Sequence, residues 1–177
     1  RKQAAAAFGS MKDPRGVVPL LDLLRDRSAM VRAEAATALG AIGDAKTVPA
    51  LIENGLCDTT PEVALAANGA LVTIGEPAVE PLIENLTARA SYVRERILIA
   101  LGAIGVNGSP TVKGRVAQTC QWILVRKNEN PAVRSVAAFS LGNLGAKESV
   151  AGLKQVMKDT QNDKSEDLQK LSASCRM

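Results

Sequence analysis

A short phrase recurs along this chain, and the recurrence restricts its possible folds more than any other feature. Nearly the same six residues occur at positions 38–43, 70–75, 100–105 and 140–145, with a weaker fifth copy at 7–12. Short units repeated head to tail stack side by side and share a core that runs along the stack. The sequence therefore predicts an array of repeats, and a binding surface is expected ahead of a catalytic pocket.

Two helices are predicted in each unit. Ala35, Ala38, Leu39 and Ile42 have the i, i+3, i+4, i+7 spacing of one helix face, and a second such run starts at Val48. The glycine that ends the phrase is typical of a left-handed helix cap, and it recurs as Gly43, Gly75, Gly105 and Gly145. The sequences Asp13-Pro14 and Ser109-Pro110 are typical of helix starts.

We expect an all-α chain, an α-solenoid coiled as a right-handed superhelix of about five stacked helical hairpins. The predicted units are residues 1–26, 27–58, 59–88, 89–128 and 129–159, and residues 160–177 form either a capping helix or a frayed tail. The first unit lacks part of its first helix. Its exposed apolar face would suit a further repeat before Arg1, a partner or self-association.

Composition narrows the class of protein. Apolar residues make up 46% of the chain and aromatic residues only 2%, so the core is expected to be aliphatic. No apolar run approaches the roughly 18 residues of a membrane span, and no signal peptide is visible. Cys57, Cys120 and Cys175 are far apart, which indicates free thiols in a reducing, cytoplasmic location.

The chain contains no histidine. This removes the commonest general base and the commonest metal ligand. The sequence therefore predicts no catalytic residue, no metal site and no cofactor.

The repeat resembles the short HEAT-like repeats of the phycobilisome-lyase type. The matching segments are Val31-Arg32, Ala38-Leu39-Gly40, Ile42-Gly43-Asp44 and Val48-Pro49-Ala50-Leu51-Ile52, and the resemblance covers residues 1–159. It implies that the second helix of each hairpin lines a concave wall. The iron-dependent HEAT-like hydroxylases use His-Glu ligand pairs, and this chain has none.

Charge and an insertion indicate where a partner would bind. Residues 1–88 hold eight Lys/Arg and eleven Asp/Glu (net −3), whereas residues 89–159 hold eleven and four (net +7). The fourth unit is about nine residues longer than the others and contains the only tryptophan, which either shapes a partner site or fills the core. The predicted partner-binding residues are Asp22, Glu53, Glu84, Lys113, Arg115, Trp122, Arg126, Lys127 and Lys158. The alternative is that the charged residues are simply solvated.

An arginine precedes the phrase in most units. Arg32, Arg94 and Arg134 each follow a valine, and they are expected to form an intramolecular ladder with loop carbonyls or with acids such as Asp44. The alternative is a row that binds phosphates.

The leading functional hypothesis is a non-catalytic scaffold, and not an enzyme, that binds another protein along the concave wall. One alternative is a phycobilin lyase-like subunit acting on a tetrapyrrole chromophore protein. The other is nucleic-acid binding through the basic C-terminal half.

Overall fold

The computed structural model describes residues 1–87, 89–145 and 154, and the chain divides into two compact units, Arg1–Glu84 and Asn85–Met177. Unit 1 contains α1 (Lys2–Met11), η1 (Pro14–Gly16), α2 (Val17–Leu23), α3 (Ala29–Ile42), η2 (Ala45–Thr47), α4 (Val48–Ala50), η3 (Leu51–Leu56), α5 (Pro61–Ile74), η4 (Glu76–Ala78) and α6 (Val79–Glu84). Unit 2 contains α7 (Ser91–Asn107), α8 (Pro110–Leu124) and α9 (Pro131–Leu144). The described residues include no strand, and the predicted all-α solenoid class is confirmed.

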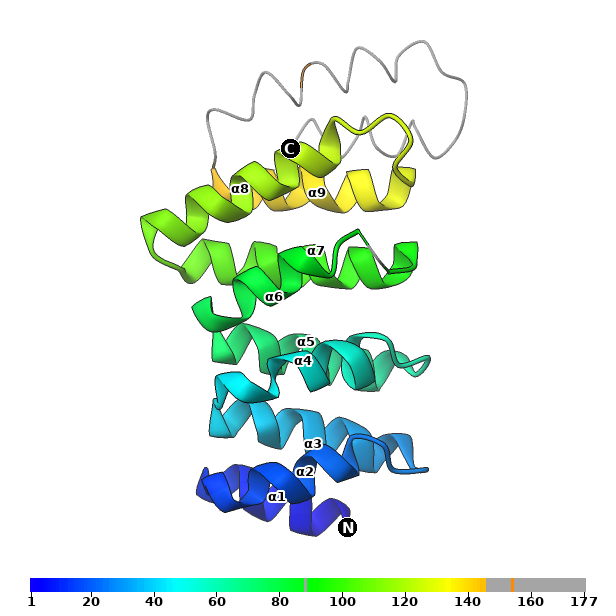
Figure 1. Cartoon of the computed structure of the whole chain (residues 1–177), viewed down its shortest axis with the longest axis vertical. Helices are drawn as coiled ribbons and strands as arrows, with labels where there is room; N and C mark the ends of the chain where they lie inside the picture. The colour runs from blue at the N-terminus through cyan, green and yellow to red at the C-terminus, as the bar shows by residue number, and fades with distance from the viewer. Residues whose placement is uncertain (88, 146–153, 155–177) are drawn as a thin grey trace. The chain divides into compact units, whose positions relative to one another are not determined.

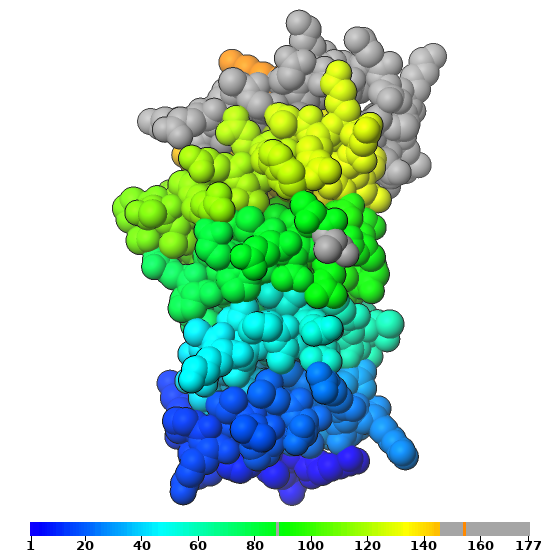
Figure 2. All heavy atoms as spheres, in the orientation of Figure 1, coloured from blue at the N-terminus to red at the C-terminus, as the bar shows by residue number. Residues whose placement is uncertain are grey.

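In unit 1 the first helices of successive hairpins pack side by side. Helix α3 lies between α1 and α5, while α2 packs on α3 and η3 packs on α5, so that the second helices form a second layer (Figure 1). Figure 2, seen from the same side, shows the atoms of this second layer packed against one another on the near face. The core between the layers is aliphatic, as predicted, with Leu20, Leu39, Leu51 and Leu71 fully buried.

Small residues let the first helices approach one another closely. A Cβ atom added to Gly40 in α3 would lie 2.5 Å from the Cα atom of Ala70 in α5, and one added to Gly9 would lie 2.9 Å from Ala38. In unit 2, where α7, α8 and α9 contact one another, Gly102 faces Ser140 in the same manner. The first glycine of the repeated phrase therefore sets the distance between stacked helices.

The glycine that ends the phrase has the predicted capping role in α3. Gly43 caps the helix with φ 77°, and Lys12, at the equivalent position after α1, adopts the same left-handed conformation with φ 50°. The same prediction for Gly105 is wrong, because α7 continues to Asn107 and buries Gly105 within the helix. The inserted residues that follow extend this helix instead of ending it.

The second helix of the second hairpin contains one more residue than its counterparts. This residue is accommodated in η3, a π-helical segment that keeps Leu51, Ile52 and Leu56 buried. A π-helix is the usual way to insert one residue into a helix without turning its apolar face away from the core.

No helix in the described part of the chain has both the length and the apolar character needed to span a membrane. Residues 160–177, where a capping helix or a frayed tail is predicted, lie outside the described residues.

Candidate functional site

A groove runs across the first helices of unit 1, on the side of α3 that faces away from the core. We call it the α3 groove. It has a volume of about 400 Å³ and is lined by Lys2, Ala29, Met30, Ala33, Glu34, Thr37, Thr60 and Glu62. The lining residues of α3 alternate with its buried positions, because the core takes Val31, Ala35, Ala36, Ala38 and Leu39. The volume falls within the usual range of small-ligand sites.

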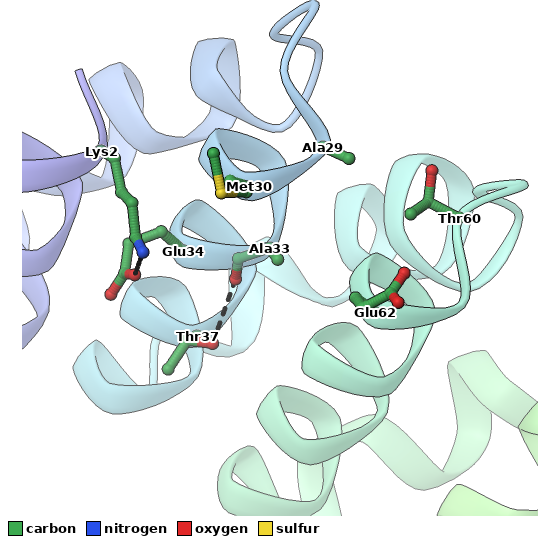
Figure 3. A pocket seen from close by; sticks show the side chains of 8 residues that line it. All are labelled: Lys2, Ala29, Met30, Ala33, Glu34, Thr37, Thr60 and Glu62. Carbon is green, nitrogen blue, oxygen red and sulfur yellow. Dashed lines mark hydrogen bonds and ion pairs between the residues drawn. The ribbon is translucent and has the colours of Figure 1, made fainter.

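The groove combines two carboxylates with an apolar strip. Glu34 projects from α3, and its Oε2 atom lies 3.9 Å from the Nζ atom of Lys2. Glu62 comes from the first turn of α5, on the side that faces α3 (Figure 3). Between the two carboxylates lie Ala33 and the side chain of Met30, which is 68% exposed. One lysine against two glutamates leaves the groove with a net charge of −1.

An arginine network fixes one edge of the groove. The guanidinium of Arg32 donates to both carboxylate oxygens of Asp58, at 2.6 and 3.1 Å, and to the hydroxyl of Thr60 at 3.2 Å. It also donates to the carbonyl oxygen of Asp26 at 2.9 Å. Arg32 therefore ties the loop before α3 to the loop before α5, which carries the groove residue Thr60.

Burial raises the pKa of Asp58, but the hydrogen bonds from Arg32 and from Thr60 outweigh it and hold this pKa below its usual value. The pKa of Arg32 is raised by its hydrogen bonds to Asp58. The side chains of Arg32 and Asp58 are only 17% and 8% exposed. The pair is therefore charged and largely shielded from water.

The same contact recurs between other repeats. Arg1 binds Asp26 at 2.5 Å, and Arg94 pairs with Glu129 and donates to the carbonyl of Arg89. Arg134 is buried and donates to the carbonyl of Leu124 at 2.9 Å. Each acid of the ladder lies in the loop that precedes a first helix.

Asp44, which we predict as a ladder acid, has another role. It precedes η2 and accepts the backbone N–H of Lys46 at 2.9 Å, while the acid that binds Arg32 is Asp58. Asp44 lies at the turn inside a hairpin, whereas stacking brings Arg32 to the loop of the following hairpin.

The predicted partner-binding residues are divided between the two units, and those of unit 1 do not line the α3 groove. Asp22, Glu53 and Glu84 are exposed on the second helices of unit 1. Lys113, Arg115 and Trp122 are exposed on α8 of unit 2, and Arg126 and Lys127 follow that helix. Lys158 lies outside the described residues. Their role as a partner surface stays a prediction.

Trp122 does not fill the core. Its side chain is 47% exposed, and the guanidinium of Arg126 lies over its ring, 4.5 Å from the centroid. The core positions of α8 are held by Val116, Cys120, Ile123 and Leu124. The core interpretation of Trp122 is therefore wrong.

The two described cysteines, Cys57 and Cys120, are free thiols. Burial raises the pKa of Cys120 to about 12, so its thiolate is scarce at neutral pH. We expect iodoacetamide to modify Cys57 of the native chain at least about tenfold faster than Cys120, as measured by mass spectrometry of the two cysteine peptides. Equal rates in the folded chain, with both sites reacting fully in denaturant, would contradict this.

Comparison with known proteins finds repeat matches in both units and an enzyme as a relative. Residues 1–70 match HEAT repeats, and residues 133–159 match the PBS lyase HEAT-like repeat. Deoxyhypusine hydroxylase-B from Oryza sativa subsp. japonica is 27% identical over 213 aligned positions, which cover 89% of this chain and 70% of the relative.

Two solved structures are also similar. An engineered protein superposes with a TM-score of 0.51 at 21% identity. The alignment covers 98% of this chain and 87% of the engineered chain. Human deoxyhypusine hydroxylase in complex with glycerol superposes with a TM-score of 0.48 at 21% identity. The alignment covers 99% of this chain and 77% of the human chain. The engineered protein supports the fold alone.

These findings correct the functional hypothesis. The relative is an enzyme, so the interpretation of the chain as a non-catalytic scaffold, and the expectation that it is not an enzyme, are overturned. The phycobilin lyase-like and nucleic-acid-binding alternatives do not correspond to the activity of this relative either.

The residues of this chain do not fit an iron centre built from His-Glu pairs. The whole sequence lacks histidine, and within the ranges that the structure describes no three Cys, Asp or Glu side chains are grouped to hold a metal ion. An iron ion bound without histidine would need carboxylate side chains from at least two helices or loops to meet at one point.

The repeat matches at residues 1–70 and 133–159 agree with the paired helices and with the glycines that space them. The matches include the residues on which the resemblance was based, from Val31-Arg32 to Val48–Ile52. The chain is a HEAT-like repeat protein.

Proposed function

We propose that this chain recognises a lysine-derived, amine-bearing side chain of a protein substrate, as part of a protein-modifying activity related to that of deoxyhypusine hydroxylase-B. The similarity to that enzyme supports a substrate of this class. Deoxyhypusine is a lysine whose ε-amino group carries an aminobutyl chain, so it presents two cationic nitrogens separated by methylene groups. A site for it needs separated anionic groups with an apolar strip between them.

The α3 groove has this arrangement, and it is the observation that carries the proposal. Glu34 and Glu62 come from adjacent helices, with Ala33 and the exposed Met30 between them. In the proposed complex the carboxylates bind the two nitrogens, and Met30 packs against the methylene groups. The incoming amine competes with Lys2 for Glu34. The Nζ atom of Lys2 lies 3.9 Å from the Glu34 carboxylate, which is a long ion pair that an amine can displace.

In this function the described residues bind the substrate. They carry out no redox step, because they do not fit an iron centre of the His-Glu type. We also propose a reducing, cytoplasmic location, which the free thiols of Cys57 and Cys120 support.

The test is calorimetric titration with three matched peptides that carry deoxyhypusine, lysine or acetyl-lysine at one position. We expect the deoxyhypusine peptide to bind most tightly and the acetylated peptide not to bind. The double variant Glu34→Gln, Glu62→Gln should weaken binding of the deoxyhypusine peptide by roughly tenfold, since two partly exposed ion pairs together contribute about 1–2 kcal/mol.

Glu53→Gln, Glu84→Gln is the matched control, because it removes two exposed carboxylates from the second helices of the same unit. It should leave the affinity unchanged. Equal binding of all three peptides, or an equal loss in both double variants, would rule out recognition in the α3 groove.

A further inference from the structure

Two exposed faces of opposite charge lie outside the α3 groove, one in each unit. The acidic face consists of Asp22 on α2, Glu53 on η3, and Glu80 and Glu84 on α6, all exposed on the second helices of unit 1. The basic face consists of Arg115 on α8 with Arg126 and Lys127 just after it, all exposed in unit 2. Helix α8 contains no acidic residue.

The difference in charge extends over unit 1 and over residues 85–145 of unit 2. Residues 1–84 hold eight Lys/Arg and eleven Asp/Glu, a net charge of −3, and residues 85–145 hold eight and two, a net charge of +6. In unit 2, Glu129 is already paired with Arg94. An acidic surface that approaches residues 85–145 therefore meets little like charge.

The two faces also match in length. Because α1, α3 and α5 pack side by side, each hairpin advances by about 8–10 Å, which puts Asp22 and Glu84 about 16–20 Å apart. Arg115 and Arg126 are eleven residues apart along and just beyond α8, which corresponds to about 16 Å at the rise of an α-helix. One α8 helix is therefore long enough to cross all three second helices of unit 1.

Trp122 supplies the basic face with an anchor. It lies between Arg115 and Arg126 in the sequence, is 47% exposed, and its ring is held by the Arg126 guanidinium. Half-exposed tryptophans and arginines are enriched at protein–protein interfaces, where they contribute a large share of the affinity. Atoms of α8 (yellow-green) form part of the near surface of unit 2 in Figure 2.

We propose that the chain self-associates head to tail, with the α8 face of one copy laid across the acidic face of a second copy. The occupant is a second copy because its own unit 1 supplies the complementary charge at the matching spacing. Such a contact joins two different surfaces and leaves one face of each kind open, so association continues as the concentration rises. This inference does not depend on the proposed function.

Sedimentation velocity of the full chain tests it. We expect the weight-average sedimentation coefficient to rise with concentration at about 50 mM salt and to stop rising at about 500 mM salt, where charges are screened within a few ångströms. The acidic-face variant Glu53→Lys, Glu84→Lys and the basic-face variant Arg126→Glu, Lys127→Glu should each associate at least about tenfold more weakly than the unmodified chain.

Mixing the two variants is the decisive experiment. The unmodified basic face of one variant can bind the unmodified acidic face of the other, and the two reversed faces are also opposite in charge. The mixture should regain association that neither variant shows alone. Glu95→Lys, a single charge reversal on α7, is the control and should associate like the unmodified chain. Circular dichroism confirms that each variant is folded.

An unmodified chain that stays monomeric up to about 100 µM at low salt would overturn the proposal, since steered but weak contacts are populated in that range. So would a mixture of folded variants that remains monomeric. Association that persists at high salt and in both variants would also overturn it, and would indicate an apolar interface elsewhere.

Discussion

Replacing Gly40 by alanine is expected to destabilise the chain by about 2–3 kcal/mol, as overpacking of a close contact does. The new Cβ atom would lie 2.5 Å from the Cα atom and 2.7 Å from the Cβ atom of Ala70. Both are atoms with no rotamer to change, so α3 and α5 must move apart. The midpoint of thermal unfolding, followed by circular dichroism, should fall by about 4–10 °C.

Gly69→Ala is the matched control for Gly40→Ala. Gly69 is also inside a helix of unit 1, but it is exposed and no heavy atom lies within 4 Å of its added Cβ. Alanine there should stabilise the chain by roughly 0.5–1 kcal/mol, because it lowers the entropy of the unfolded backbone and favours the helix. If the two variants shift the midpoint in the same direction, helix spacing is not set at Gly40.

These two glycines illustrate what could be read from the sequence. The repeated phrase predicts both helices of each hairpin and the aliphatic core, because helical periodicity depends only on neighbours in the chain. The phrase includes Gly40 and not Gly69, but it does not show what Gly40 packs against, and by helix propensity alone both are poor helix residues. Only the stacking of α3 on α5 gives Gly40 its role.

The arginine ladder shows the same limit at longer range. Its recurrence is visible in the sequence, but the partner of Arg32 is Asp58, 26 residues further along. The predicted partner, Asp44, lies in the same hairpin as Arg32, whereas Asp58 lies in the loop before the next one. A usable signal did exist, because Asp26 and Asp58 each precede a Ser or Thr by two residues and accept its backbone N–H.

The sequence does not indicate the α3 groove, since the family resemblance implies a binding wall on the second helices. Glu34 and Glu62 are ordinary solvated residues in the sequence, and they share a groove only because α3 and α5 are adjacent. The position of Trp122 is likewise not evident from the repeat alignment. The insertion before α8 shifts the register, and one residue of shift turns a helix face by about 100°, which places Ile123 in the core instead.

Replacing Arg32 by methionine is expected to cost about 2–4 kcal/mol of unfolding free energy at pH 7, measured by urea titration. Methionine keeps the aliphatic length of the side chain but removes every donor. The carboxylate of Asp58, whose side chain is 8% exposed, then loses the two charged hydrogen bonds from Arg32 while it stays shielded from water. Removing one partner of a buried ion pair is more costly than the net contribution of the pair, because it leaves an uncompensated charge.

The effect of Arg32→Met should depend on pH with a defined sign. The hydrogen bonds from Arg32 and Thr60 hold the pKa of Asp58 in the folded chain below its ordinary value. A carboxyl group of this kind stabilises the fold above the pKa of the unfolded chain, and the contribution is lost as the pH falls through the folded value. The difference between the unmodified chain and Arg32→Met should therefore be largest at neutral pH and shrink below about pH 4.

Two further variants separate the buried pair from charge loss in general. Arg15→Met removes an arginine whose side chain is 89% exposed and pairs with Asp13. It should cost much less stability than Arg32→Met, because water already solvates the Arg15 guanidinium and Asp13 keeps the hydrogen bond from the backbone N–H of residue 15. Asp58→Asn added to Arg32→Met should restore part of the loss, since the neutral amide is less costly to bury. If Arg32→Met is no more harmful than Arg15→Met, or if Asp58→Asn adds its full cost on top, the repeats are held together by their apolar faces alone and the ladder contributes nothing to their stacking.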